Sequence, residues 1–422
     1  MEMDKCFMKK RYLIIISFLI LGSCYLLNFK MNDESTKNII GVYINDEYSN
    51  NVPLKDSGYY VDKIECDNGS SGEWDYVNWG LLTTNMSKKS KCNVYFKKDI
   101  IVEVIKDELD TTDKCPIVND DGSVNVTSAE FENSLLCSAP DNYGTSYYYR
   151  GNVTNNYVYF ANLYWRIIRI NGDGSIRMIY DGTSAHENGE ASEDRIIGTS
   201  AFNEKSDDNA YVGYMYGTPG SATYEETHAN INDSTIKKNV DNWYENNIKG
   251  TNYEQYLADN LFCNDRTISK YNPDNHSNYG FGAEFTNYVR AYGPWSAPSN
   301  TENAKMKFYC KQLNDSFTVQ SSLGNMSLKY AISLLNKDEL ILSGLYSSGN
   351  STKSNYLADG NNYWLISPDA FEELGAKVRN EKVNGESFNV VNVVYGVKPV
   401  INLKQGSLKH GDGTINNPYR IN

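Results

Sequence analysis

The chain has 422 residues and a formal net charge of −13, because 53 acidic residues outnumber 40 lysines and arginines. A surface of this sign repels phosphate, which excludes nucleic acid and anionic lipid headgroups as partners. Residues 31–422 are enough for two or three domains, since a domain usually has roughly 100–200 residues.

An apolar segment from Tyr12 to Phe29 follows the basic cluster Lys9-Lys10-Arg11 and ends at Lys30. Its length falls between a signal-peptide core of roughly 7–15 residues and a spanning helix of roughly 17–25 residues. The cluster lies on the N-terminal side, so the positive-inside rule leaves the N-terminus in the cytoplasm. We therefore predict a membrane anchor or signal segment over residues 1–30 and a cell-membrane location with the bulk of the chain extracellular.

Cys24 offers a second way of anchoring, because Leu21-Gly22-Ser23-Cys24 resembles a bacterial lipobox, in which cleavage precedes a lipid-bearing cysteine. The chain stays apolar from Tyr25 to Phe29, which is unusual at the start of a mature lipoprotein. We favour an uncleaved membrane span. A lipoprotein lipidated at Cys24 is the second interpretation, and a freely secreted product is the third.

Six cysteines follow the anchor segment, namely Cys66, Cys92, Cys115, Cys137, Cys263 and Cys310. An even number of cysteines in an oxidising compartment indicates disulfide bridges. These six form three close couples along the chain, so the simplest pairing joins neighbours: 66 with 92, 115 with 137, and 263 with 310. Each bridge would contribute about 3–4 kcal/mol in the chain-entropy estimate.

Residue spacing gives little support for metal or catalytic chemistry. The sequence has no CxxC pair and its four histidines are scattered, so we expect no metal and no cofactor. Cys263 is conceivable as a nucleophile beside Asp265 and Arg266, but an arginine next to a thiol supplies no base. Adjacent acids such as Glu372-Glu373 and Asp207-Asp208 would point apart on a strand. We predict no catalytic residue, and an enzymatic activity stays an open alternative.

Residues 39–106 are predicted to form a small β-sandwich-like domain. Short aromatic or β-branched runs, separated by turn residues, cover Gly41–Ile44, Tyr59–Cys66, Asp75–Thr84 and Cys92–Phe96. Trp74 and Trp79 would supply the core near the first bridge. A domain of this size needs such a bridge for stability.

Residues 107–149 are polar and contain the second cysteine couple, so we predict a disulfide-tied connector. The run Asn119-Asp120-Asp121-Gly122 suggests a calcium loop. With Gly122 at loop position six, however, Ile117 and Ser128 occupy the first and twelfth positions, where acidic ligands are needed. The run Asn171-Gly172-Asp173-Gly174 fails the same test, and both runs are predicted to be turns.

Residues 150–422 are predicted to form a larger α+β domain, which opens with a hairpin. The apolar runs Tyr164–Ile170 and Ser175–Tyr180 flank the turn at 171–174. Ser234 can cap a helix that ends near Gly250.

Two further helices are predicted after this one. The first covers Tyr253–Phe262 and carries leucine and tyrosine inward. The second covers Lys337–Ser343, because Asn336 and Glu339 have the spacing of a capping box.

The chain then returns to strands, which gives an α+β order. Asn362–Ile366 is one strand, and Ala376–Val383 is predicted to pair with Glu386–Val394 across a type I′ turn at Asn384-Gly385. Val397–Leu403 is predicted to close the same sheet.

Several blocks of the large domain together resemble an uncharacterised family of surface proteins from low-GC gut bacteria. They include Tyr159–Gly182, Phe262–Arg266, Tyr363–Pro368, Gly396–Leu403 and Gly411–Tyr419. The Trp-Leu-x-Ser-Pro and Gly-Val-x-Pro blocks are also distantly similar to the closing strands of C-type-lectin-like and formylglycine-generating-enzyme-like folds. The resemblance therefore implies a C-type-lectin-like large domain. The calcium-ligand motifs of sugar-binding lectins are missing, so it implies no calcium-dependent activity.

The leading functional hypothesis is a membrane-anchored cell-surface protein that acts as a non-enzymatic binding module toward glycans or proteins. The Tyr-, Asn- and Gly-rich loop Asn272–Asn300 is a candidate, because binding residues concentrate on loops held by a rigid frame. The 34 tyrosines suit stacking on sugars, although an AT-rich genome enriches tyrosine and asparagine as well. A purely structural envelope component and an extracellular enzyme of unknown reaction are the alternatives, and the sequence does not identify the binding residues.

Overall fold

The computed structural model describes residues 39–55, 57–76, 78–86, 89–126, 134–294, 297–299, 301–345, 355–373, 375–382 and 385–421. This part of the chain is rich in β-strand and has short helices, which makes it a mixed fold of β-rich character. None of its helices has the length and apolar character needed to cross a membrane. The apolar segment Tyr12–Phe29, with Cys24, lies outside the described residues.

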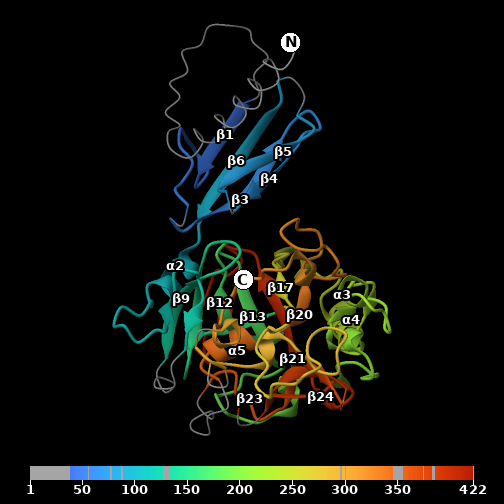
Figure 1. Ribbon diagram of the computed structural model, residues 1–422. Helices are drawn as coiled ribbons and strands as arrows, with labels where there is room; N and C mark the ends of the chain where they lie inside the picture. Colours follow the sequence, from blue (N-terminus) through green and yellow to red (C-terminus); the bar gives the residue numbers. More distant parts are fainter. Residues whose placement is uncertain are drawn as a thin grey trace, which may run out of the picture.

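The first six strands form a small unit that stands apart from the rest of the chain (Figure 1). They are β1 (Ile39–Ile44), β2 (Glu47–Ser49), β3 (Tyr59–Cys66), β4 (Ser71–Asp75), β5 (Gly80–Thr84) and β6 (Lys91–Lys98). One sheet has the order β2-β1-β6-β3, with β1 parallel to β6, and β4 pairs with β5 as a hairpin. Trp74 packs with Val42, Val94 and Phe96 to form its core.

The predicted single strand Asp75–Thr84 is wrong, because a turn divides it into the ends of β4 and β5. The Asp75 carboxylate accepts hydrogen bonds from both the backbone and the side-chain nitrogen of Asn78, at 2.9 and 2.7 Å. Such a bond pattern makes an aspartate a strong turn former. Trp79 follows in a left-handed conformation (φ 52°), which reverses the chain into β5.

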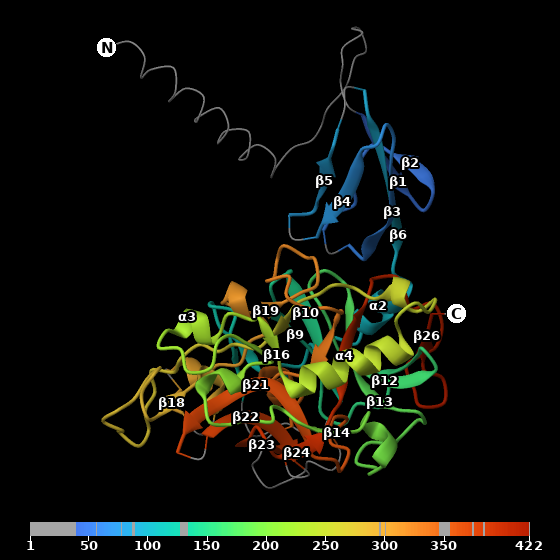
Figure 2. The same ribbon diagram turned by 90° about the vertical axis from the view of Figure 1, so that its right-hand side faces the viewer.

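Helix α2 (Ile100–Lys106) joins the small unit to the large unit, which comprises everything that follows (Figure 2). Asp99 caps the helix by accepting the N–H of Val102 at 3.2 Å. Val102 and Ile105 are fully buried in the main core of the large unit, so α2 packs as part of that unit.

The large unit contains two sheets of more than two strands within the described residues. The first includes β9 (Leu135–Pro140), β10 (Thr145–Arg150), β11 (Tyr157–Phe160), β12 (Leu163–Ile170), β13 (Ile176–Gly182), β20 (Ile332–Leu334), β25 (Pro399–Leu403) and β26 (Tyr419–Arg420). The second includes β14 (Thr199–Ala201), β18 (Thr286–Asn287), β21 (Tyr363–Glu372), β22 (Gly375–Lys382), β23 (Gly385–Val390) and β24 (Val394–Gly396). One continuous core, with Trp165 and Trp364 fully buried, lies between them.

Shorter elements connect and cover these sheets. The paired strands are β7 (Ile117–Val118) with β8 (Val124–Asn125), β15 (Met215–Tyr216) with β16 (Asn232–Asp233), and β17 (Phe262–Cys263) with β19 (Ser316–Phe317). The helices are α3 (Tyr224–Thr227), α4 (Thr235–Asn247) and α5 (Lys337–Leu342), and the 3-10 turns are η1 (Glu193–Arg195), η2 (Asn209–Val212), η3 (Glu254–Tyr256), η4 (Val289–Ala291), η5 (Glu302–Ala304) and η6 (Leu313–Asp315). Helix α4 contacts β14 of one sheet and β20 of the other, so it bridges the two.

The predicted connector over residues 107–149 is not a separate segment in the structure. Strands β9 and β10 pair with each other, and β10 continues into the first sheet through β12. The two hairpin turns are tied together, because the Asp141 carboxylate accepts the backbone N–H of Gly144 at 3.0 Å and of Gly172 at 2.9 Å. Both predicted non-calcium runs are turns, at β7–β8 and at β12–β13.

The capped helices are confirmed. Ser234 accepts the N–H of Lys237 at the start of α4, and Asn336 and Glu339 form the predicted capping box of α5. The predicted helix Tyr253–Phe262 is wrong, because only the turn η3 forms there. The chain instead pairs with the end of β25, where Ala258 N–H donates to Asn402 O at 2.8 Å.

The C-terminal hairpin forms between β22 and β23, with Lys382 opposite Gly385. Residues 383 and 384 therefore lie between the strands. Asn384 lies outside the described residues, so the predicted type I′ turn stays a prediction. Gly385, the second residue of that turn, has a positive φ of 114°. The prediction for Val397–Leu403 is wrong, because β25 joins β13 and β20 in the first sheet.

Candidate functional site

The cysteines form three disulfide bridges within the described residues, with the predicted partners: Cys66–Cys92, Cys115–Cys137 and Cys263–Cys310. The first joins β3 to β6, and the second ties the segment after α2 to β9. The third joins β17 to the segment before η6. Cys263 therefore has no free thiol in this structure, and the nucleophile alternative for it is wrong.

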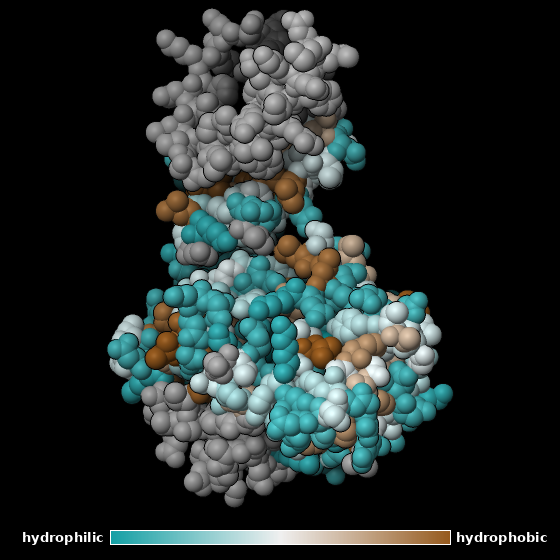
Figure 3. Space-filling view, viewed as in Figure 1, coloured by the Kyte–Doolittle hydropathy of each residue, from teal (hydrophilic) through white to brown (hydrophobic). Residues whose placement is uncertain are grey.

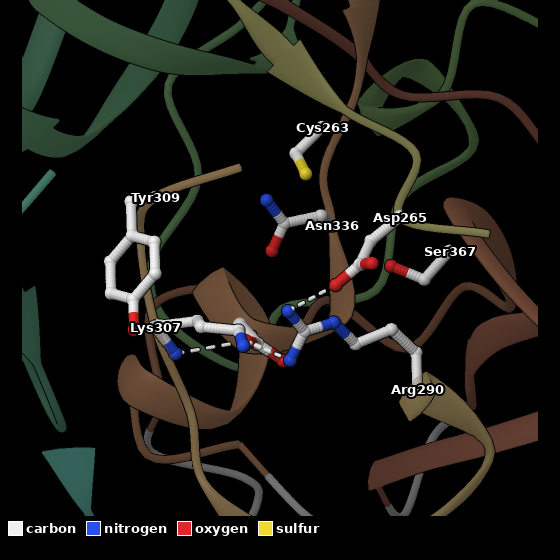
Figure 4. A pocket seen from close by; sticks show the side chains of 8 residues that line it. Cys263, Asp265, Arg290, Lys307, Tyr309, Asn336 and Ser367 are labelled. Atoms are coloured by element: carbon white, nitrogen blue, oxygen red, sulfur yellow. Dashed lines mark hydrogen bonds and ion pairs between the residues drawn. The ribbon is translucent and has the colours of Figure 1, made fainter. Parts of the chain in front are cut away.

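Around Cys263 the surface is hollowed into a small cavity, which we call the polar pit (Figure 4). It is lined by Cys263, Asp265, Arg290, Lys307, Tyr309, Asn336, Asp338 and Ser367. These side chains come from β17 and its continuation, η4, the segment after η5, the start of α5, and β21. Its cavity volume is about 10 Å³, which is roughly the room that one water molecule needs.

The five residues Phe262–Arg266 hold one wall of the polar pit in place. The Asn264 side chain accepts the N–H of Tyr214 at 3.0 Å and donates to Ile366 O at 2.8 Å. Arg266 donates to the buried Asp315 carboxylate at 2.6 Å. With both neighbours anchored inward, Asp265 adopts a left-handed conformation (φ 48°) and lines the pit.

Arg290 is the central charge of the polar pit. Its guanidinium donates to Asp265 Oδ2 and to Asp338 Oδ2, each at 2.5 Å. In Figure 4 the Arg290 side chain extends across the pit and meets the Asp265 carboxylate. Lys307 lies beside it and pairs with Glu302 at 3.1 Å. The charges of the pit are therefore mutually compensated, as buried charges must be.

The pKa values of the two aspartates are shifted in opposite directions although both pair with Arg290. Burial acts to raise the pKa of Asp265, but the attraction of Arg290 and the hydrogen bond from Thr267 outweigh it, and the pKa is lowered. Burial raises the pKa of Asp338, and Arg290 offsets this only in part. Burial, followed by the repulsion of Arg290, lowers the pKa of Lys307.

Asp338 has one carboxylate oxygen that is not used. Oδ2 accepts from Arg290 and from the backbone N–H of Lys307, whereas the buried Oδ1 has no hydrogen-bond partner among the described residues. The residue is only 2 % exposed. An unmade hydrogen bond on a buried carboxylate costs free energy.

The amide of Asn336 adds a donor on the other side of the polar pit. Its Oδ1 is engaged as the cap of α5, where it accepts the N–H of Glu339 at 2.9 Å. The amide nitrogen points toward Cys263 (Figure 4). The residues that line the polar pit thus include Asn336, with its amide nitrogen, and Asp338, with an unused buried oxygen.

The predicted loop Asn272–Asn300 contributes Arg290 to the polar pit through η4. Its aromatic rings pack within the protein, with His276 stacked on Phe285 at a centroid distance of 3.6 Å and Tyr292 set edge-on to Tyr271, the residue that precedes the loop. Trp295, Ser296 and Asn300 lie outside the described residues.

The acid pairs Asp207-Asp208 and Glu372-Glu373, which the sequence does not predict to be catalytic, each have one member with a local structural role. Asp208 caps η2, and Glu372 pairs with Lys377. Over the residues that the structure covers, no group of histidine, cysteine and acidic side chains could hold a metal ion.

A row of tyrosines crosses the outer face of the small sheet but is closed to ligands. Tyr48, Tyr43 and Tyr95 occupy paired positions on β2, β1 and β6. Tyr43 stacks on Tyr95 at 4.7 Å and meets the edge of Tyr48 at 5.8 Å, while Lys63 covers Tyr95 at 4.3 Å. The faces of Tyr43 and Tyr95 are thus occupied within the protein.

The sequence did not predict the polar pit as a site. Its residues are spread from position 263 to position 367 and come from five segments. The available signals are the Phe262–Arg266 block, the capping box at Asn336 and the block containing Ser367, and none of them indicates on its own that these segments meet. Comparisons of the chain with protein-family models, curated proteins and solved structures found no match.

Proposed function

We propose that this chain is a membrane-anchored cell-surface protein whose large unit is a non-enzymatic binding module for glycans or proteins. The cysteine nearest the polar pit is bridged and the pit's cations are paired with carboxylates, which leaves no activated nucleophile in it. The location rests on the apolar segment Tyr12–Phe29 and its basic flank.

One observation carries the binding proposal. Asp338 lines the polar pit, and its buried Oδ1 has no hydrogen-bond partner among the described residues. The unmade hydrogen bond costs free energy, which a donor group on a ligand would recover.

We extend the proposal to the fold and the family. The Trp-Leu-x-Ser-Pro block forms the first half of β21, which carries Ser367 into the polar pit, and the Gly-Val-x-Pro block leads into β25. These are the strands whose sequences resemble the closing strands of C-type-lectin-like domains. We propose that the large unit is a C-type-lectin-like domain of the gut-bacterial surface-protein family.

The test is an array experiment with the full chain in detergent-solubilised form. A panel of glycans and a panel of cell-surface proteins are probed in parallel, with a reduced sample as the control for folded protein. Reproducible binding that reduction abolishes supports the binding module. The absence of binding on both panels overturns it in favour of a structural component, and turnover of an arrayed glycan overturns it in favour of an enzyme.

A further inference from the structure

We infer that Lys398 and Asp359 react with each other to form an amide bond between their side chains. The bond would join the segment before β21 to the residue before β25, 39 positions further along the chain. Strands β21 to β24 of the second sheet would then lie within one covalently closed loop. This cross-link goes beyond the proposed binding function, because it would form in the folded chain whether or not a ligand binds.

The two side chains meet inside the large unit. Charged side chains normally lie at the surface, and hydrophilic residues are spread over the visible face of the large unit (Figure 3). Asp359, however, is 0 % exposed and Lys398 is 1 % exposed. Lys398 Nζ donates a hydrogen bond to Asp359 Oδ2. Such a bond holds the nitrogen near the carboxylate carbon, close to the roughly 3–3.5 Å at which a reaction can begin.

The Asp359 carboxylate is held in an orientation that suits this reaction. Its Oδ1 accepts the backbone N–H of Asn361 at 2.9 Å, a donor that would stabilise negative charge on Oδ1 as the amide forms. Oδ2, on the lysine side, is the oxygen that would leave. Asp181 lies 4.0 Å from Lys398 Nζ, but it is paired with Arg195 at 2.6 Å. Asp359 is therefore the acid that the lysine contacts.

A neighbouring buried acid can move the protons. Glu381 on β22 is 0 % exposed, and neither of its carboxylate oxygens has a hydrogen-bond partner among the described residues. Burial, followed by the charge of Asp359, raises the pKa of Glu381 well above its usual value, and the charge of Lys398 acts against this. Glu381 therefore carries a proton that it can donate. A purely structural ion pair has no use for such a neighbour, which is costly to bury.

The reaction balances without a further reagent, because the ammonium of Lys398 and the carboxylate of Asp359 together contain the atoms of one amide and one water molecule. A proton passes from Nζ to Oδ2, and the nitrogen lone pair then forms a bond with Cγ. Glu381 donates its proton to Oδ2, the Cγ–Oδ2 bond breaks and water leaves. Glu381 recovers a proton from the nitrogen, so it is unchanged at the end.

Burial and proximity both favour the amide. Two buried ions lose hydration free energy, whereas an amide has no net charge. The fold also holds the two groups together permanently, and well-oriented groups reach effective concentrations of roughly 10⁵–10⁸ M. The ion pair is thus placed to react rather than only to attract.

The experiment maps peptides of the full chain after reduction, alkylation and digestion with chymotrypsin, which cuts after aromatic residues. We expect the peptides that contain Asp359 and Lys398 to be recovered joined, about 18 Da below the sum of their masses, because one water molecule is lost. Fragmentation should place the link on these two side chains. An unreduced digest that contains the Cys263–Cys310 bridge shows that the sample was folded. Separate peptides from such a sample overturn the inference.

Lys398→Arg is the matched variant, because a guanidinium keeps the positive charge but stays protonated and is no nucleophile. We expect its two peptides to be separate and to have lost no water. The sequence Asp359-Gly360 can also lose water by closing a succinimide ring with its own backbone. A loss of about 18 Da that persists in Lys398→Arg would therefore assign the lost water to that ring and overturn the amide bond.

Glu381→Gln tests the proton transfer. Glutamine has no proton to donate, so we expect the fraction of joined peptide to fall at least about tenfold in the folded variant. A fraction that stays as high as in the unmodified chain overturns the role of Glu381 and leaves the bond between Lys398 and Asp359 standing.

Discussion

Glu381 is a buried acid whose charge the protein does not compensate well. It lies on β22 opposite Tyr363, and neither carboxylate oxygen has a hydrogen-bond partner among the described residues. Burial, followed by the nearby Asp359, raises the pKa of Glu381 well above its usual value, and Lys398 offsets this only in part. Lys398 itself forms an ion pair with Asp359. Glu381 therefore stays protonated in the folded protein well beyond the pH at which a free glutamate ionises.

The substitution Glu381→Gln should change how stability depends on pH. Above about pH 4.5 the unfolded chain releases the Glu381 proton while the folded chain keeps it, so the stabilising effect of this proton is lost as the pH rises. The free energy of unfolding of the unmodified protein falls by at most about 1.4 kcal/mol per pH unit from this group. Glutamine does not titrate, so the free energy of unfolding of Glu381→Gln should rise relative to that of the unmodified protein between pH 5 and pH 8. Denaturant titrations at each pH measure this difference.

The exposed Glu47→Gln is the control for this measurement, because it removes the same charge from the surface of β2. Its stability curve should run parallel to that of the unmodified protein. If the Glu381→Gln curve is parallel as well, Glu381 has a partner or solvent access that the structure lacks.

At the residue scale, the sequence was informative where chemistry depends on residue type alone. The cysteine couples could be paired because an oxidising compartment and short spacing leave one simple arrangement. No comparable sequence signal indicates that Asp338 and Arg290 pair with each other. An aspartate at the start of a helix and an arginine in a polar loop are ordinary in sequence, and only the packing of α5 against η4 turns them into a buried pair.

At the element scale, helix α4 depends on a cap that can be tested directly. Ser234 is fully buried, and its side chain accepts the N–H of Lys237 at 3.2 Å. We expect Ser234→Ala to lower the free energy of unfolding by about 1 kcal/mol, because that N–H loses its partner. Ser234→Thr keeps the hydroxyl and should cost less. Equal stability of the alanine and threonine variants in urea titrations would contradict a capping role.

Local sequence signals predicted elements well where the interacting residues lie close together in the sequence. The caps of α4 and α5 and the β12–β13 hairpin involve residues a few positions apart, and all three are confirmed. The predictions that failed concern segments whose partners are distant in the sequence. Segment 253–262 has a helical pattern, but its backbone bonds to residues 402 and 404 around β25 instead. β25 itself joins β13, more than two hundred positions earlier in the chain, a pairing that no local pattern specifies.

At the scale of the whole molecule, the junction between the small and large units depends on Gly406. Its N–H donates to Asp99 Oδ2 at 2.6 Å, and its φ is 74°. A β-carbon at this position would lie 2.1 Å from Cζ of Tyr60 on β3. The small unit and the large unit therefore contact each other closely at this glycine.

We expect Gly406→Ala to loosen this junction, because the Tyr60 ring must move. The cost should be about 1–3 kcal/mol beyond the strain of the left-handed backbone. Gly250→Ala is the matched control, since Gly250 has φ 70° and nothing within 4 Å of the added atom. Hydrogen exchange around Asp99 and α2 should increase in the first variant only. Equal exchange in both would mean that the junction does not depend on this contact.

The anchoring proposal is tested on the intact chain by Cys24→Ala. We expect the unmodified protein to stay with the membrane fraction, because Tyr12–Phe29 reaches the minimum of roughly 17 apolar residues for a span. A spanning helix keeps its hold after the loss of one thiol, so the variant should sediment with membranes as before. A lipoprotein would lose its attachment, and release of the variant into the medium would therefore overturn the spanning helix in favour of lipidation. Cys6→Ala removes a thiol outside the lipobox and should leave the distribution unchanged under either form of anchoring, whereas recovery of the unmodified chain in the medium would exclude both.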